Sequence, residues 1–300
     1  MRLATSGILV NQFNQLLLIQ RNDTRTFAEP GGGLEKGELP TDNIAREVRE
    51  ETGIIALPVR LVSLNYWALP PHGFLAFTFR CLQRGGELQT SAESPRVGFY
   101  ATHPLPRPML PVNRQRIDHA LKHDGGPVQW WTVPYPLFMR LGRFFLFNGI
   151  YRWYDWRRKA QGLPLYQTPP NWEIDTRVVL QNESGAVLWH QANGAYCLPG
   201  GIVPPQTAPW DTAVTLTHQQ TGLTPQLQDV SGIYVIENSS RMLMVFTAVP
   251  HPSAPTMSGN TWLPPGQIPS ELPSQCHQII QHATKPDRQT ICQHLPDDCP

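Results

Sequence analysis

The stretch that decides the fold reads GGGLEKGE at residues 31–38, continues LPTDNIA through residue 45, and ends REVREETGI at residues 46–54. It predicts a glycine-rich loop followed by a short helix, because Pro40 suits the first helical position and Gly53 stands where a left-handed C-terminal cap would go. On that helix the carboxylates of Glu47, Glu50 and Glu51 share an arc of roughly 100°. Carboxylates this close repel one another unless a cation lies among them. The spacing therefore predicts a site for a hard, oxygen-seeking ion such as Mg²⁺.

This spacing resembles the signature of the Nudix (MutT-type) hydrolases: G, five residues, E, seven residues, then R-E-apolar-x-E-E-x-G-apolar. The defined positions are all met, by Gly32, Glu38, Arg46, Glu47, Val48, Glu50, Glu51, Gly53 and Ile54. The resemblance implies an α/β/α sandwich around a mixed sheet. It also implies an enzyme that cleaves the pyrophosphate of a nucleoside diphosphate linked to another group, with a small nucleotide as its partner.

The resemblance assigns the metal chemistry to the helix and its loop. Glu47 and Glu51 are the expected principal ligands, together with the backbone carbonyl of Gly31, and Glu50 is either a third ligand or the general base. Mg²⁺ is the expected cofactor, and Mn²⁺ could take its place. Such ions bridge the phosphates, neutralise charge in the transition state and lower the pKa of the attacking water.

Two further polar groups are expected to support this chemistry. Glu38 precedes the helix and is expected to orient Arg46 or an outer-shell water. Many Nudix enzymes carry another carboxylate just before a late strand, as an extra ligand or as the base. Glu93 is the candidate for that position, with Glu87 as the less well placed alternative.

Substrate contacts are expected on both sides of the helix. Arg21 precedes the glycine loop, where a phosphate could lie, although a surface arginine needs no function. Pro70 matches a proline that recurs in Nudix enzymes acting on ADP-ribose, which favours ADP-ribose-like substrates over nucleoside triphosphates. Tyr66 could stack on a base, but an aromatic near a strand end is usually core. The expected substrate-binding set is Arg21, Gly32, Gly33, Glu38, Tyr66 and Pro70.

Length, charge and cysteine content bound the class of protein. The 300 residues suffice for two domains, each with its own core. A net charge of +1 gives no general attraction to nucleic acid. The five cysteines follow no framework spacing, which indicates a reducing compartment. No run of uncharged apolar residues reaches the roughly 18 of a membrane helix. We therefore expect a cytoplasmic protein that binds no nucleic acid.

The second half of the chain repeats the order of the first. AYCLPGG at residues 195–201 lines up with TFAEPGG at 26–32, and QQTGL at 219–223 falls against EETGI at 50–54. In that register Thr215 and Leu216 stand for Arg46 and Glu47, so the box carboxylates and the arginine are gone. We expect a catalytic Nudix domain over 1–125 and a degenerate Nudix-like copy over 171–300 that cannot hold a metal tightly. The copies would form a pseudo-dimer within the chain, and a homo-oligomer is the alternative.

The connector, residues 126–170, interleaves aromatic side chains with arginine and lysine. Residues 137–159 are expected to be helical and to pack between the two domains, since large aromatics join domains well. A membrane-surface helix and a segment that binds single-stranded nucleic acid by stacking remain as alternatives.

Two other function classes compete with the hydrolase. A non-catalytic nucleotide sensor or scaffold built on the same fold would be marked by broken carboxylates, and those of the first copy are intact. A Nudix-type transcription regulator would need an appended helix-turn-helix, whereas the second half is predicted to form strands and a degenerate loop.

Overall fold

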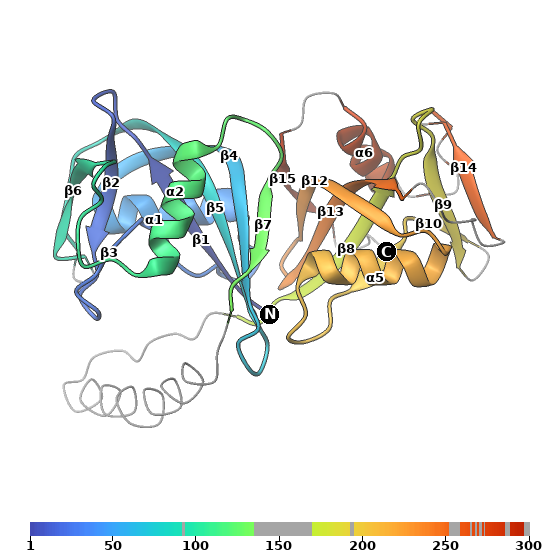
Figure 1. The fold of residues 1–300 in the computed structure, drawn as a ribbon, viewed down its shortest axis with the longest axis horizontal. Coiled ribbons are helices and arrows are strands. Elements are labelled where there is room, and N and C mark those ends of the chain that lie inside the picture. The colour runs from blue at the N-terminus through green and yellow to red at the C-terminus, as the bar shows by residue number, and fades with distance from the viewer. Residues whose placement is uncertain are drawn as a thin grey trace.

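The computed structural model describes residues 1–91, 94–134, 170–192, 195–251, 259–264, 266–267, 269, 272, 274–285 and 289–296. Figure 1 shows two groups of elements side by side, one blue to green and one yellow to red. We call residues 1–134 the first half and residues 170–296 the second half.

The first half is a mixed α/β unit, as the sequence predicts. Its elements are β1 (Arg2–Leu9), β2 (Gln15–Gln20), β3 (Phe27–Ala28), α1 (Pro40–Thr52), β4 (Ile54–Trp67), β5 (Phe74–Gly86), β6 (Arg96–Ala101), α2 (Pro111–Lys122) and β7 (Gln129–Thr132). The main sheet has the order β1-β5-β4-β7, and β3-β2-β6 form a smaller sheet. β1 with β5 and β4 with β7 are parallel, whereas β4 with β5 is antiparallel. Because β7 belongs to this sheet, the unit extends past the boundary expected at residue 125.

The second half has the same order of elements, with one additional strand, β11, before its first helix. They are β8 (Glu173–Leu180), β9 (Val187–Ala192), β10 (Ala195–Cys197), β11 (Gly200–Ile202), α5 (Pro209–Thr221), β12 (Pro225–Ile236), β13 (Arg241–Pro250), β14 (Asn260–Leu263), α6 (Ser274–Ala283) and β15 (Ile291–Leu295). Its sheets are β11-β8-β13-β12-β15 and β10-β9-β14. The strands β8-β13-β12-β15 pair in the same parallel and antiparallel senses as β1-β5-β4-β7.

Helix α1 forms where the sequence predicts it. Pro40 begins the helix, where its missing N–H costs no hydrogen bond, and Gly53 ends it at φ 75° with its N–H donated to the carbonyl of Arg49. Ile44 and Val48 are fully buried and approach the backbone of β1 at Gly7. These contacts fix the rotation of α1 about its axis, and thereby the direction in which its carboxylates point.

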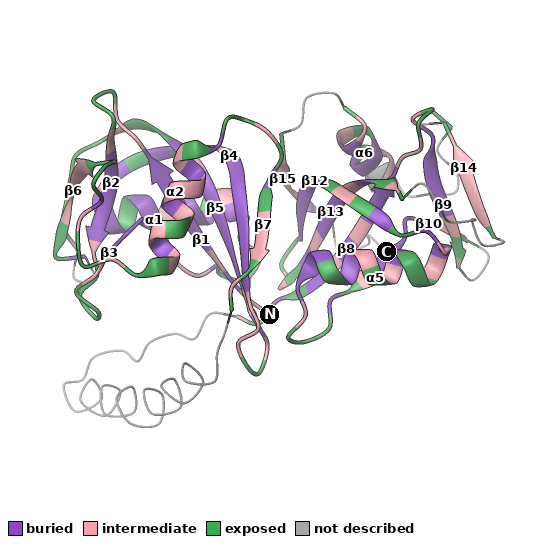
Figure 2. Ribbon diagram, viewed as in Figure 1, coloured by how far each residue is buried: buried purple, intermediate pink, exposed green. Residues whose placement is uncertain are grey.

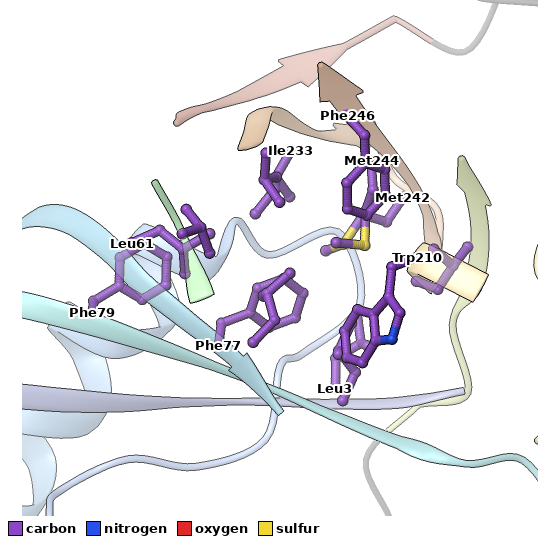
Figure 3. Packing of buried hydrophobic residues seen from close by; sticks show 14 of the residues in the cluster. Leu3, Leu61, Phe77, Phe79, Trp210, Ile233, Met242, Met244 and Phe246 are labelled. Carbon is purple, nitrogen blue, oxygen red and sulfur yellow. The ribbon is translucent and has the colours of Figure 1, made fainter. Parts of the chain in front are cut away.

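One buried apolar cluster runs through both halves. Leu3 and Phe77 contribute from the first sheet, and Trp210, Met244 and Phe246 contribute from the second half (Figure 3). Two aromatic pairs cross between the halves, Tyr66 with Trp210 at 6.3 Å and Trp130 with Phe246 at 6.0 Å between ring centroids. Figure 2 shows the central strands β1, β5, β8 and β13 as largely buried. The halves therefore share a core.

Backbone hydrogen bonds also join the halves. Met1 and Trp172 exchange two of them, each 2.6 Å long. The N–H of Val128, just before β7, donates to Asp229 at 2.9 Å inside the protein.

The expected connector helix at 137–159 lies outside the described residues, together with its packing, membrane and nucleic-acid alternatives. Within the described ranges, no helix combines the length and apolar character needed to cross a membrane.

Candidate active site

The glycine loop and the last turns of α1 bring two carboxylates to one place. The N–H of Gly31 donates to Oε2 of Glu51 at 2.8 Å. A Cβ on Gly32 would lie 2.4 Å from the carboxyl carbon of Glu47, so only glycine leaves room for that side chain. Glu51 is buried, and the side chain of Glu47 is 15% exposed. Both predicted principal ligands therefore face the loop.

Arg46 forms ion pairs with three carboxylates beside the glycine loop. Its guanidinium lies 2.8 Å from Oε1 of Glu38, 3.0 Å from Oε1 of Glu47 and 3.1 Å from Oε2 of Glu50. Asn43 ties the same unit together, because its amide donates to Glu38 and to the carbonyl of Gly33. Glu38 thus contacts Arg46 directly, and Arg46 also contacts Glu47.

The carboxylates differ in how they hold a proton. Burial acts to raise the pKa of Glu38, but hydrogen bonds from Arg46, the Glu35 N–H and Asn43 hold that pKa below its usual value. Burial raises the pKa of Glu47, and Glu50 adds to the rise against the opposing charge of Arg46. The hydrogen bond to Glu38 raises the pKa of Arg46, which stays charged.

The donor set suits a divalent cation. Glu38, Glu47 and Glu50 surround one guanidinium and Glu51 faces the adjoining glycine loop, which leaves excess negative charge on hard oxygen donors in a half-buried place. Glu47 and Glu51 would hold the ion. Among the described residues no three His, Cys, Asp or Glu side chains converge on one point. Glu50 does not join the pair, since its side chain is 59% exposed and bonded to Arg46.

The other predicted residues are dispersed. Arg21 pairs with Asp23 at 2.7 Å in the turn after β2. Tyr66 is 1% exposed and packs in the shared core, where its ring offers no face to a base. Pro70 is exposed in the β4–β5 connection. Glu93 lies outside the described residues, and Glu87 is exposed next to Gly53.

A buried ion pair behind the loop was not predicted. The side chain of Glu29 is buried and contacts two residues of α2. Nη2 of Arg116 forms an ion pair with its Oε1 at 2.8 Å, and Nδ2 of Asn113 donates to its Oε2 at 3.1 Å. Arg116 also donates to Ser6 of β1 at 3.1 Å. These bonds attach the start of the glycine loop to α2. A charged residue directly before Pro30-Gly31, inside an apolar context, was the available signal.

A basic groove opens where the chain enters α2. It encloses about 680 Å³ and is lined by Arg107, Pro108, Met109 and Arg114. The carbonyl of Pro108 accepts the N–H of Phe27 at 2.8 Å, which places this wall beside β3 and the residues leading into the glycine loop. No acidic side chain of the described residues lines the groove, so it suits an anion.

Comparison with known proteins places relatives on the first half. The NUDIX domain family matches residues 1–118. A MutT-like protein from Streptomyces ambofaciens is 34% identical over 130 residues, which cover 41% of this chain and 83% of that protein. An 8-oxo-dGTP diphosphatase from Haemophilus influenzae is 42% identical over 124 residues, which cover 40% of this chain and 90% of that protein. An ADP-ribose pyrophosphatase from Methanocaldococcus jannaschii is 32% identical over 111 residues, which cover 35% of this chain and 64% of that protein.

Proposed function

The chain belongs to the Nudix family and is a pyrophosphohydrolase, and we propose that its first half performs this reaction with Mg²⁺ held by Glu47 and Glu51. One observation carries the proposal: two carboxylates, one buried and one nearly so, face a glycine loop that leaves space beside them. The intact pair also sets the non-catalytic alternative aside.

When bound, a divalent ion at this place would neutralise phosphate charge and lower the pKa of the attacking water. The residues of the chain position the carboxylates that would hold the ion. Arg46 and the Gly31 N–H fix the directions of Glu47 and Glu51 before any ligand arrives, so no reorganisation is needed during the reaction. The ion pair between Glu29 and Arg116 attaches the start of the glycine loop to α2.

We propose a nucleoside triphosphate as the substrate, ahead of ADP-ribose. The relative with the higher identity is named for a nucleoside triphosphate, whereas the ADP-ribose pyrophosphatase is less similar and matched over a smaller share of its length. Pro70, the residue that favoured ADP-ribose in the sequence, is an exposed loop residue. This ranking revises the sequence-based expectation.

We assign the basic groove to the substrate's outer phosphates. Neither Arg107 nor Arg114 has a side-chain partner within the part of the chain that the structure describes, and Arg114 is half-buried. Arg114→Ala is therefore expected to raise KM about tenfold, with kcat little changed. Arg84→Ala, at an exposed position of β5 outside the groove, is the matched control and should leave KM unchanged.

We propose that the second half is a degenerate Nudix copy and the fixed partner of the first. The matching strand pairing supports this, and so does α5, which begins at Pro209 and ends at Gly222 with φ 77°, as α1 does at Pro40 and Gly53. Both long hairpins carry a bulge at the same place, before Ser63 in β4 and before Gly232 in β12.

The experiment is a hydrolysis screen of the full chain. Purified protein with Mg²⁺ is offered 8-oxo-dGTP, the four ordinary dNTPs, ADP-ribose and NADH, and released products are separated by ion exchange. Mg²⁺-dependent formation of a nucleoside monophosphate from a triphosphate is expected. Turnover of ADP-ribose alone would overturn the substrate proposal, and no turnover of any compound would overturn the active-site proposal.

A further inference from the structure

The two glycine loops meet their helices through the same bond. α1 and α5 are both 13 residues long, and Glu51 and Gln220 hold the same position in them. The N–H of Gly31 donates to Oε2 of Glu51 at 2.8 Å, and the N–H of Gly200 donates to Oε1 of Gln220 at 2.8 Å. Gln220 therefore reproduces the first contact of the catalytic carboxylate.

Gln220 then makes a contact that a carboxylate cannot make. Its Nε2 donates to the carbonyl oxygen of Gly200 at 2.9 Å. An ionised carboxylate only accepts hydrogen bonds, so Glu51 cannot satisfy the carbonyl of its own loop glycine in this way. In the first half such a carbonyl needs a cation or another donor, whereas in the second half the amide supplies the donor.

The rest of the second loop is closed to a cation. Leu216 takes the position of Glu47, and its Cδ1 lies 2.9 Å from where a Cβ on Gly201 would stand. The backbones of the two loops are held alike. Gly200, Gly201 and Ile202 pair with β8, and the first loop is bonded to β1 through the Gly32 carbonyl and the Leu34 N–H, so the loops differ in the side chains that face them. No charged oxygen donor replaces the lost ligands at these positions.

We propose that Gln220 is an amide clip that takes the place of a bound metal in the second half. The clip holds the Gly200 loop in its folded conformation with no cation present, so the second half stays folded as a partner whether or not metal is available. The inference rests on the proposed status of the second half as a degenerate copy.

The test is thermal unfolding of the full chain carrying Gln220→Glu, in EDTA at pH 7. The glutamate keeps the acceptor for the Gly200 N–H but places negative charge against the Gly200 carbonyl, so the Tm should fall by about 4 °C or more. Gln219→Glu adds the same charge one residue earlier at an exposed position and should change the Tm by less than about 1 °C. Equal Tm values for the two variants would overturn the clip.

Measurements at lower pH distinguish loss of the Gln220 hydrogen bond from a general packing defect in the Gln220→Glu variant. At about pH 4.5 the carboxyl group introduced by Gln220→Glu becomes protonated and can again donate to the Gly200 carbonyl, so the Tm difference between the two variants should shrink. A difference that is unchanged or larger at that pH would overturn the proposal. The measurement also works if Gln220→Glu is unfolded at pH 7, because folding should then return on acidification.

A second arm tests the absence of metal from the second half. In a chain that carries both Glu47→Gln and Glu51→Gln, addition of Mn²⁺ should not raise the Tm, and a clear rise would overturn the claim that the second half holds no cation. Hydrolysis is measured separately on the unmodified chain. If the variants behave as expected but no substrate is cleaved, the proposed function fails while the clip stands.

Discussion

At the scale of single residues, one guanidinium holds two carboxylates whose pKa values move in opposite directions. Arg46, the Glu35 N–H and Asn43 lower the pKa of Glu38 by hydrogen bonding, so the folded state favours the charged form of Glu38. Burial raises the pKa of Glu47, so its charged form is less favourable in the metal-free folded state than in the unfolded chain. Without metal, the negative charge on Glu47 is therefore unfavourable in the folded protein, and Glu47 is a residue proposed to hold the metal.

This difference predicts opposite effects of two matched substitutions in EDTA. Glu38 contributes stability above its usual pKa of about 4.5, and that stability is lost as the pH falls through its lowered pKa. Glu38→Gln should therefore lower the Tm at pH 7 by roughly 2–5 °C, the size of one charge-assisted hydrogen bond. Glu47 disfavours folding once the pH rises through its raised pKa, so Glu47→Gln should raise the Tm at pH 7.

Differential scanning calorimetry from pH 3.5 to 7.5 measures both effects, and both should fade at the acid end. A lower Tm for Glu47→Gln than for the unmodified chain at pH 7 without metal would contradict the description of the cluster.

At the scale of elements, the site depends on a loop backbone that lies against the carboxylates of α1. Gly32 has no side chain, and this lets Glu47 approach the loop. The second half offers an internal comparison, because Gly201 faces Leu216 in the same arrangement.

Alanine at the two glycines is expected to separate catalysis from folding. Gly32→Ala should displace the end of the Glu47 side chain and lower kcat at least tenfold, with a Tm change of only a few degrees. Gly201→Ala displaces Leu216 instead and should leave kcat unchanged. Steady-state hydrolysis of the two variants checks this, and equal activities would argue against a role for Glu47.

The sequence predicts these elements well where local chemistry decides them. Proline at the start, the carboxylate spacing and a glycine cap are all local, and α1 runs from Pro40 to Thr52 as expected. The length of β4 is not fixed locally, because this strand begins at Ile54, directly after the helix cap, and continues to Trp67. Strand ends follow from partners far away in the chain, here β5 and β7, which no local pattern specifies.

At the scale of the whole molecule, the halves are joined through a shared apolar core, and a few hydrogen bonds add to it. Figure 3 shows Trp210 close to Phe77 and Leu3 of the first half, with Met242 and Met244 beside it. The first sheet would expose this surface if the second half were absent. The same surface explains why Tyr66 could be mistaken for a base-stacking residue, since Trp210, which covers it, is remote in sequence.

Trp210→Ala is expected to destabilise both halves together. Loss of a large buried ring costs roughly 3–5 kcal/mol and should lower the Tm by several degrees. The informative measurement is thermal inactivation of hydrolysis, an activity of the first half, in a variant of the second half. Phe13→Ala, at a position that is 72% exposed, is the control and should inactivate like the unmodified chain. Unchanged inactivation of Trp210→Ala would mean that the halves unfold independently.

The central claim, that Glu51 is a metal ligand in the reaction of the first half, is tested most directly by the hydrolysis rate of Glu51→Gln at saturating Mg²⁺. Gln220 shows that glutamine at this helix position can bond the loop glycine at its N–H and carbonyl, so the variant should fold with a similar Tm. Removal of a preorganised charge at constant shape is expected to lower kcat/KM at least about a hundredfold. A folded Glu51→Gln chain with kcat/KM within about threefold of the unmodified chain would contradict the account.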